Sequence, residues 1–237
     1  MAAPNPDTAE IYYQAGMNAF QQKDLPNAFA LFLSAAQNGH PDAMFRMGVF
    51  YYHGIMVKKD PKEAFKWFLH AARKGHVAAM SEVGIMYAEG NKTQKSPDKA
   101  YGWTLKAAEN GHPQAIYNLG SFYERGIGVE QDYVTAVRLY ERAADADIPE
   151  AAYSLARLCY AGIGTRMDRA RSLRLVKKAA DLGHRQAMLD TAVLYYEGDG
   201  VEMDEAEALK YFKLAYDNGI RGAKKYIDEI ESKNAQA

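Results

Sequence analysis

The dipeptide Ala-Ala recurs every 36 residues, at positions 35–36, 71–72, 107–108, 143–144 and 179–180. Glycines keep the same step at 54, 90, 126, 162 and 198. A fixed period of roughly 20 to 50 residues is typical of an array in which each repeat is one supersecondary unit. The 237 residues are therefore expected to form one elongated repeat domain without an internal linker.

Each repeat has the spacing of two short helices. In residues 113–148, apolar side chains recur at three and four residue intervals on both sides of the break Gly126-Ile127-Gly128-Val129. Glycines there can adopt positive φ where the first helix ends, and Asp132 can cap the second. Small residues such as Gly120 and Ala144 allow the two helices to approach closely, so the sequence predicts a helical hairpin per repeat.

Composition excludes several classes of function. Lys and Arg number 29 against 30 Asp and Glu, so the net charge of −1 gives no general attraction to nucleic acid. The single cysteine, Cys159, occupies a repeat position held elsewhere by tyrosine and is expected to be a packed thiol. His40, His76, His112 and His184 are separated by whole repeats, so no metal site or cofactor is predicted. No catalytic motif stands out, and we expect a protein that is not an enzyme.

The sequence contains no apolar run long enough to span a membrane, which predicts a soluble protein. As written it is expected to be cytoplasmic. Residues 2–7 are also typical of the start of a mature chain, in which case Met1 replaces a removed signal peptide and the protein is periplasmic or secreted.

The segment 115–129, Ala-Ile-Tyr-Asn-Leu-Gly-Ser-Phe-Tyr-Glu-Arg-Gly-Ile-Gly-Val, resembles the SEL-one-like repeat (SLR) family, a relative of tetratricopeptide repeats. The resemblance covers almost the whole chain and implies an all-α, right-handed α-solenoid of antiparallel helix hairpins. It also implies an adaptor or scaffold for other proteins rather than a reaction.

On this basis we expect five 36-residue repeats at 41–76, 77–112, 113–148, 149–184 and 185–220, after a shorter first repeat at 9–40. The first repeat has Gln21-Gln22-Lys23-Asp24 in place of the glycine turn and looks tetratricopeptide-like. Residues 221–231 are predicted to form a capping helix with Ile227 and Ile230 facing inward. Residues 1–8 and 232–237 are predicted to be flexible.

The resemblance implies that the first helix of each repeat lines the concave side and binds a protein or peptide there. The candidate groove residues are Tyr13, Met17, Phe20, Phe45, Val49, Tyr52, Tyr117, Ser121, Glu124, Tyr153, Arg157, Tyr160, Leu189, Val193 and Tyr196. The alternative for the aromatic position that includes Tyr13 and Phe45 is ordinary packing between helices. Tyr52, Tyr160 and Tyr196 lie one turn beyond the packed tyrosines and are expected to be exposed.

The fifth repeat departs most from the pattern, with Ala156, Cys159, Thr165 and Ser172, which indicates a specialised repeat. Residues 149–184 hold seven basic and three acidic side chains, a net charge of +4, and residues 185–220 hold three and eight, a net charge of −5. Its basic run is Arg166, Arg169, Arg171, Arg174, Lys177 and Lys178. Either this run is neutralised by the acidic residues of the sixth repeat, Glu202, Asp204, Glu205 and Glu207, or it docks an acidic partner.

Two functions remain open. The first is a non-enzymatic adaptor that binds a partner protein or peptide in the concave groove. The alternative is an exported envelope or host-contact factor, such as a regulator or an immunity-type inhibitor, that binds through the basic face of the fifth repeat. The sequence does not distinguish oligomeric states.

Overall fold

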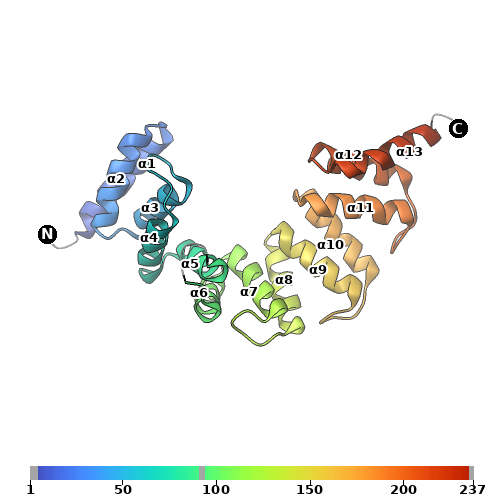
Figure 1. Ribbon diagram of the computed structural model, residues 1–237, viewed down its shortest axis with the longest axis horizontal. Coiled ribbons are helices and arrows are strands. Elements are labelled where there is room, and N and C mark those ends of the chain that lie inside the picture. The colour runs from blue at the N-terminus through green and yellow to red at the C-terminus, as the bar shows by residue number, and fades with distance from the viewer. Residues whose placement is uncertain (1–4, 91–93, 235–237) are drawn as a thin grey trace. The chain divides into compact units, whose positions relative to one another are not determined.

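The computed structural model describes residues 5–90 and 94–234, which form thirteen α-helices and one short 3-10 helix (Figure 1). The prediction of an all-helical chain is confirmed. The chain divides into two bodies, each described by itself below. The N-terminal body contains residues 1–115 and 127–129, and the C-terminal body contains residues 116–126 and 130–237. Among the described residues, no helix combines the length and apolar character that crossing a bilayer requires.

The N-terminal body is a stack of three helical hairpins, in which each helix packs against the next. The helices are α1 (Pro6–Gln21), α2 (Leu25–Gln37), α3 (Pro41–His53), α4 (Pro61–Arg73), α5 (Val77–Glu89) and α6 (Pro97–Glu109). The paired alanines of the sequence repeat are buried, with Ala35, Ala36, Ala71 and Ala72 at most 2% exposed. These small side chains let successive helices approach closely.

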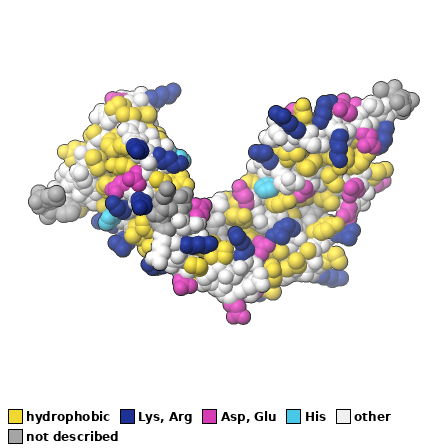
Figure 2. All heavy atoms as spheres, viewed as in Figure 1, with side chains coloured by type: hydrophobic (Ala, Val, Ile, Leu, Met, Phe, Trp, Pro, Cys, Tyr) yellow, Lys and Arg dark blue, Asp and Glu magenta, His cyan; other side chains and the backbone are white. Residues whose placement is uncertain are grey.

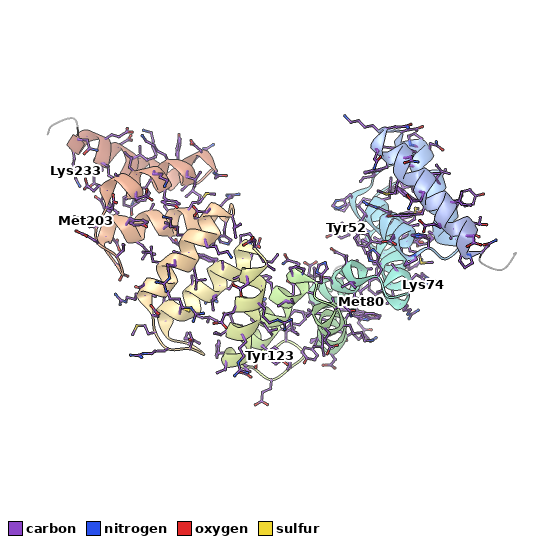
Figure 3. The ribbon with its side chains drawn as sticks, turned by 180° about the vertical axis from the view of Figure 1, so that it is seen from behind. Tyr52, Lys74, Met80, Tyr123, Met203 and Lys233 are labelled. Atoms are coloured by element: carbon purple, nitrogen blue, oxygen red, sulfur yellow. The ribbon has the colours of Figure 1, made fainter. Side chains whose placement is uncertain are left out.

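The C-terminal body continues the pattern and ends in a single helix. Its helices are α7 (Pro113–Arg125), which begins in the N-terminal body, α8 (Tyr133–Asp145), α9 (Pro149–Ala161), α10 (Arg169–Asp181), α11 (Arg185–Glu197), α12 (Glu205–Asp217), the 3-10 turn η1 (Arg221–Ala223) and α13 (Lys224–Asn234). In Figure 3, Met203 marks the loop between α11 and α12, and Lys233 marks the end of α13.

The turns end and begin helices as the sequence predicts. Gly54, Gly90, Gly162 and Gly198 cap the helices before them with φ between 68° and 76°, in the left-handed region that favours glycine. The Asp132 carboxylate accepts hydrogen bonds from the amides of Val134 and Thr135 at 2.9 and 3.1 Å, and so caps α8.

Both chain ends are more helical than predicted. The Asn5 side chain caps α1, which begins at Pro6, so residues 6–8 of the predicted flexible N-terminus are helical. The predicted capping helix at 221–231 is a 3-10 turn followed by α13, which continues to Asn234 and includes part of the predicted flexible tail at 232–237. Ile227 and Ile230 are buried, as expected. The predicted flexible residues 1–4 and 235–237 lie outside the described residues.

A small residue faces a side chain of the second helix in each hairpin. A Cβ atom added to Gly120 would lie 2.8 Å from Cε1 and 2.9 Å from Cδ1 of the buried Tyr140 ring. Gly16 and Gly48 stand in the same relation to Phe32 and Phe68. The absence of a Cβ therefore determines how closely α7 and α8 approach.

We expect Gly120→Ala to lower the free energy of unfolding by about 1–3 kcal/mol, because the new methyl group overpacks against Tyr140. Chemical denaturation followed by circular dichroism measures the change. Gly102→Ala is the matched control, since an added Cβ there meets nothing within 4 Å. This control should stabilise its helix, because alanine is the better helix former. Equal stability of the Gly120→Ala variant and the natural protein would contradict the packing argument.

Candidate functional site

A cavity of about 350 Å³ opens between α9, α10 and α11 of the C-terminal body, and is called here the C-terminal cavity. Its floor is apolar and its rim carries four charged side chains. Helix α9 contributes Tyr153, Ala156, Arg157 and Tyr160, α10 contributes Ser172 and Val176, and α11 with its following loop contributes Leu189, Asp190, Val193, Leu194, Glu197 and Asp199. Concave, mostly apolar sites with a few polar groups at the edge are typical of binding sites.

The structure brings together five of the predicted groove residues at this cavity: Tyr153, Arg157, Tyr160, Leu189 and Val193. Sequence reasoning missed Val176, Leu194, Asp190, Glu197 and Asp199 as lining residues. Ala156 and Ser172, which depart from the repeat pattern, also line the cavity. The available signal for the floor was Val176, which occupies a repeat position that holds Phe68, Tyr140 and Phe212 in other repeats.

Hydrogen bonds hold the two tyrosines of the cavity to acidic side chains. The Tyr153 hydroxyl donates to Oδ2 of Asp190 and the Tyr160 hydroxyl to Oδ2 of Asp199, both at 2.8 Å. Burial, with the hydrogen bond to Asp190, raises the pKa of Tyr153 to about 12. The hydrogen bond to Asp199 also raises the pKa of Tyr160. Both phenols are therefore protonated donors at neutral pH.

Two arginines pair with acidic side chains at the cavity and beside it. Arg169 donates to Oδ1 of Asp199 at 2.6 Å, and its guanidinium lies 5.2 Å from the centre of the Tyr160 ring. Arg157 pairs with Glu124, a predicted groove residue that also accepts from the Tyr140 hydroxyl at 2.6 Å. Tyr160 is 41% exposed, and the side chain of Arg157 is 57% exposed. Both side chains are therefore accessible to a partner while their acidic neighbours hold them in place.

The predicted exposed row of Tyr52, Tyr160 and Tyr196 is confirmed for Tyr160 and wrong for the other two. Tyr52 is half-buried against the core of the N-terminal body. Tyr196 is half-buried because its ring packs against Phe212 and Tyr226, and its hydroxyl donates to Oε1 of Glu229 at 2.6 Å. Its position therefore serves the contact between α11 and α13.

Most other predicted groove residues also pack within their own body. Phe20, at the end of α1, is 38% exposed and has the Arg46 guanidinium 5.8 Å from its ring centre. The half-buried ones are Tyr13, Met17, Phe45, Val49, Tyr117 and Ser121. At the repeat position of Tyr13 and Phe45, these two side chains pack between helices, whereas Tyr153 at the same position lines the C-terminal cavity.

The repeated histidines explain that packing. Tyr13, Phe45 and Tyr153 stack on His40, His76 and His184, with ring centres 4.2, 4.5 and 4.3 Å apart. Nδ1 of each histidine accepts a hydrogen bond from the backbone amide three residues later, so the imidazole caps the next first helix. Among the described residues, no group of three or more His, Cys, Asp or Glu side chains could hold a metal ion.

The basic run of the fifth repeat is largely paired. Nζ of Lys178 lies 2.9 Å from Oδ1 of Asp147, and Nζ of Lys177 lies 3.9 Å from Oε2 of Glu207. Arg169 pairs with Asp199, and Arg171 pairs with Glu141. Of the four acidic residues predicted to face the run, Glu207 does so. Arg166 and Arg174 are exposed and form no ion pair within the part of the chain that the structure describes. On the face drawn in Figure 2, charges of both signs are interspersed with apolar side chains.

Cys159 is fully buried, as expected for a packed thiol, and burial raises the pKa of its thiol. A thiol held in its neutral form is a poor nucleophile. Cys159 therefore acts as a small apolar side chain on the buried face of α9.

The comparisons with known proteins agree with the repeat pattern. The family model described as Sel1 repeat matches residues 8–40, 41–76, 77–112, 113–148, 149–184 and 185–220. The first segment is included, although its turn looks tetratricopeptide-like. No curated protein sequence matches the chain.

Two solved structures are similar over most of the chain. A protective antigen of uropathogenic Escherichia coli strains, which displays an SLR fold, is 29% identical over 96% of this chain with a TM-score of 0.87. The present chain spans half the length of that protein. A Sel1 repeat protein from Oxalobacter formigenes is 31% identical, with 92% of this chain and 89% of that chain covered and a TM-score of 0.84. An immunity protein from Pseudomonas aeruginosa is 18% identical over 92% of this chain and 84% of its own, with a TM-score of 0.55, and shows a likeness of fold alone.

The histidine caps predict a dependence of stability on pH. Burial lowers the pKa of His76, His112 and His184 from the ordinary value of 6.5, so folding favours their neutral forms. Stability from these groups is complete above about pH 6.5 and is lost as the pH falls through the lowered folded-state pKa. We expect the melting temperature to fall between pH 7.5 and pH 5.5.

The triple variant His76→Asn, His112→Asn and His184→Asn should flatten this dependence, because asparagine caps a helix without titrating. His53→Asn with His70→Asn is the control, since these exposed histidines cap no helix. The same pH dependence in the triple variant as in the natural protein would refute the role of the caps.

Proposed function

Because the chain belongs to the Sel1 repeat family, whose repeats bind protein partners, we propose that it is a non-enzymatic scaffold that binds a partner protein or peptide through the C-terminal cavity. The family is typically a scaffold rather than a catalyst, which supports the absence of a reaction. The observation that carries the proposal is the meeting of Tyr153, Arg157, Tyr160, Leu189 and Val193 around one apolar cavity.

The chemistry of the cavity suits a protein partner. Tyrosine and arginine dominate the binding energy of protein interfaces when they surround a pocket that excludes water. Tyr160 and Arg157 are exposed, and both are positioned by acidic partners, Asp199 and Glu124. Side chains fixed in this way lose little conformational entropy when a partner binds.

The remaining predicted groove residues have a smaller part in the proposal. Phe20 is exposed and is proposed as a further contact on the N-terminal body. Tyr13, Met17, Phe45, Val49, Tyr52, Tyr117, Ser121 and Tyr196 are half-buried and are proposed to support the binding surfaces rather than to supply their main contacts.

A second candidate is an exported regulator or immunity-type inhibitor that binds an acidic partner through the basic face of the fifth repeat. The exposed arginines Arg166 and Arg174 favour it, since the other four basic residues of the run are already in ion pairs. The same experiment can test both candidates.

We expect Tyr160→Ser to weaken binding to a captured partner protein about tenfold or more, because a ring that anchors a partner contributes on the order of 1–2 kcal/mol or more. The natural protein is used to capture partners from the source cells, and the dissociation constant of each variant is then measured with the purified partner. Tyr216→Ser is the matched control, since Tyr216 is also 41% exposed but lies on α12 outside the cavity.

The two candidates give different results in this measurement. Loss of affinity in Tyr160→Ser with retention in Tyr216→Ser supports the C-terminal cavity. Full affinity in Tyr160→Ser, with loss in the double variant Arg166→Glu and Arg174→Glu, moves the binding site to the basic face. Equal affinity in every variant rejects both sites.

A further inference from the structure

The C-terminal cavity lies where other repeats place an aromatic ring of their own. In the first, second and fourth repeats, the second helix carries Phe32, Phe68 and Tyr140, which are at most 2% exposed. Each of these rings packs beside an aromatic residue of the first helix, with ring centres 5.5 to 5.9 Å apart, in the pairs Tyr13–Phe32, Phe45–Phe68 and Tyr117–Tyr140.

The fifth repeat keeps the aromatic residues of the first helix and lacks the ring. Tyr153 corresponds to Phe45 and Tyr117, but the facing position on α10 holds Val176. Tyr160 corresponds to Phe20 and Tyr196. The ring centre of Phe20 lies 6.4 Å from that of Phe32, and the ring centre of Tyr196 lies 6.0 Å from that of Phe212. Tyr153, Tyr160 and Val176 all line the cavity. The space is therefore bounded by the aromatic neighbours of a ring that the chain does not supply.

The third repeat differs from the fifth in the residue that faces this position. The third repeat also lacks the ring, because Thr104 stands there, but it has a glycine opposite. A Cβ added to Gly84 would lie 2.3 Å from the Thr104 hydroxyl and 3.2 Å from its backbone nitrogen, so α5 and α6 are in close approach. In the fifth repeat the facing residue is Ala156, and a methyl group would not fit the approach seen between Gly84 and Thr104.

The charges around the cavity favour a basic neighbour for the group that fills it. Asp190, Glu197 and Asp199 line it against one cation, Arg157. Asp190 accepts from Tyr153 and Gln186, and Asp199 accepts from Tyr160 and Arg169. Glu197 is exposed and has no ion pair or hydrogen bond among the described residues, so its charge is available to a ligand.

Resting on the function proposed above, we propose that the C-terminal cavity is an anchor pocket for one aromatic side chain of a partner polypeptide, with a lysine or arginine next to it in sequence. The aromatic side chain enters between Tyr153 and Tyr160 and covers Val176, Leu189 and Val193. The basic side chain pairs with Glu197 at the rim. The partner thus completes the ring packing that other repeats complete internally.

The test is a selection of random twelve-residue peptides displayed on phage against the natural protein, followed by affinity measurements with synthetic peptides. We expect the selected sequences to share an aromatic residue with Lys or Arg within two positions. Val176→Phe should weaken their binding at least tenfold, because the new ring fills the cavity. The fold tolerates this change in principle, since the sixth repeat pairs Ala192 with a buried Phe212.

Two further variants make the result specific. Glu197→Lys should weaken the binding of the basic peptides about threefold to tenfold at low salt, and by less at high salt. Val134→Phe is the matched control, because Val134 is 50% exposed on α8 outside the cavity and should leave affinity unchanged. Circular dichroism and the melting temperature verify that each variant folds.

Each outcome supports or overturns the anchor. Selected peptides that carry an aromatic and a basic residue and lose affinity for Val176→Phe support the anchor pocket. Peptides that bind Val176→Phe as tightly as the natural protein overturn the anchor, while the proposed partner binding stands if Tyr160→Ser weakens the captured protein. A selection that yields no peptide also overturns the anchor, and binding of a folded partner would still register in the capture experiment.

Discussion

Each repeat depends on the contact between a buried side chain of its second helix and a small residue of its first. The distance between the two helices is set there, since a ring pressed against a glycine leaves no room for a methyl group, as at Gly120 and Tyr140. Paired alanines extend the same close approach to the next repeat. Packing between the helices therefore defines their positions, and the turns, caps and loops connect helices at those positions.

Periodicity predicted this architecture well because it records packing that recurs. The glycines that end first helices, the cap at Asp132 and the inward isoleucines of α13 could all be recognised as repeated or terminal features of the sequence. The chain ends were predicted less well. The cap at Asn5 and the extension of α13 to Asn234 depend on local hydrogen bonds that no repeat position announces.

The candidate site was predicted in part for the same reason. Tyr153, Arg157 and Tyr160 were found because they lie on the first helix at positions implied by the family. The half-burial of Tyr196 was missed because its neighbours on α13 follow the last repeat and have no counterpart within the array. The cavity itself was missed because it is caused by a side chain that is too small. The missing aromatic ring can be recognised only when Val176 is compared with Phe32, Phe68 and Tyr140 at the same position of other repeats.

The junction between the fourth and fifth repeats is built differently from those with a histidine cap. Ile148 stands where the histidine would be, and α9 begins without a side-chain cap. In its place, basic side chains of the fifth repeat reach back to Glu124, Glu141 and Asp147. Ion pairs at a surface weaken as salt rises, whereas a hydrogen bond to a half-buried neutral imidazole depends little on salt. Ionic strength therefore acts on this junction, beside the cavity, whereas acidity acts on the junctions capped by His76, His112 and His184.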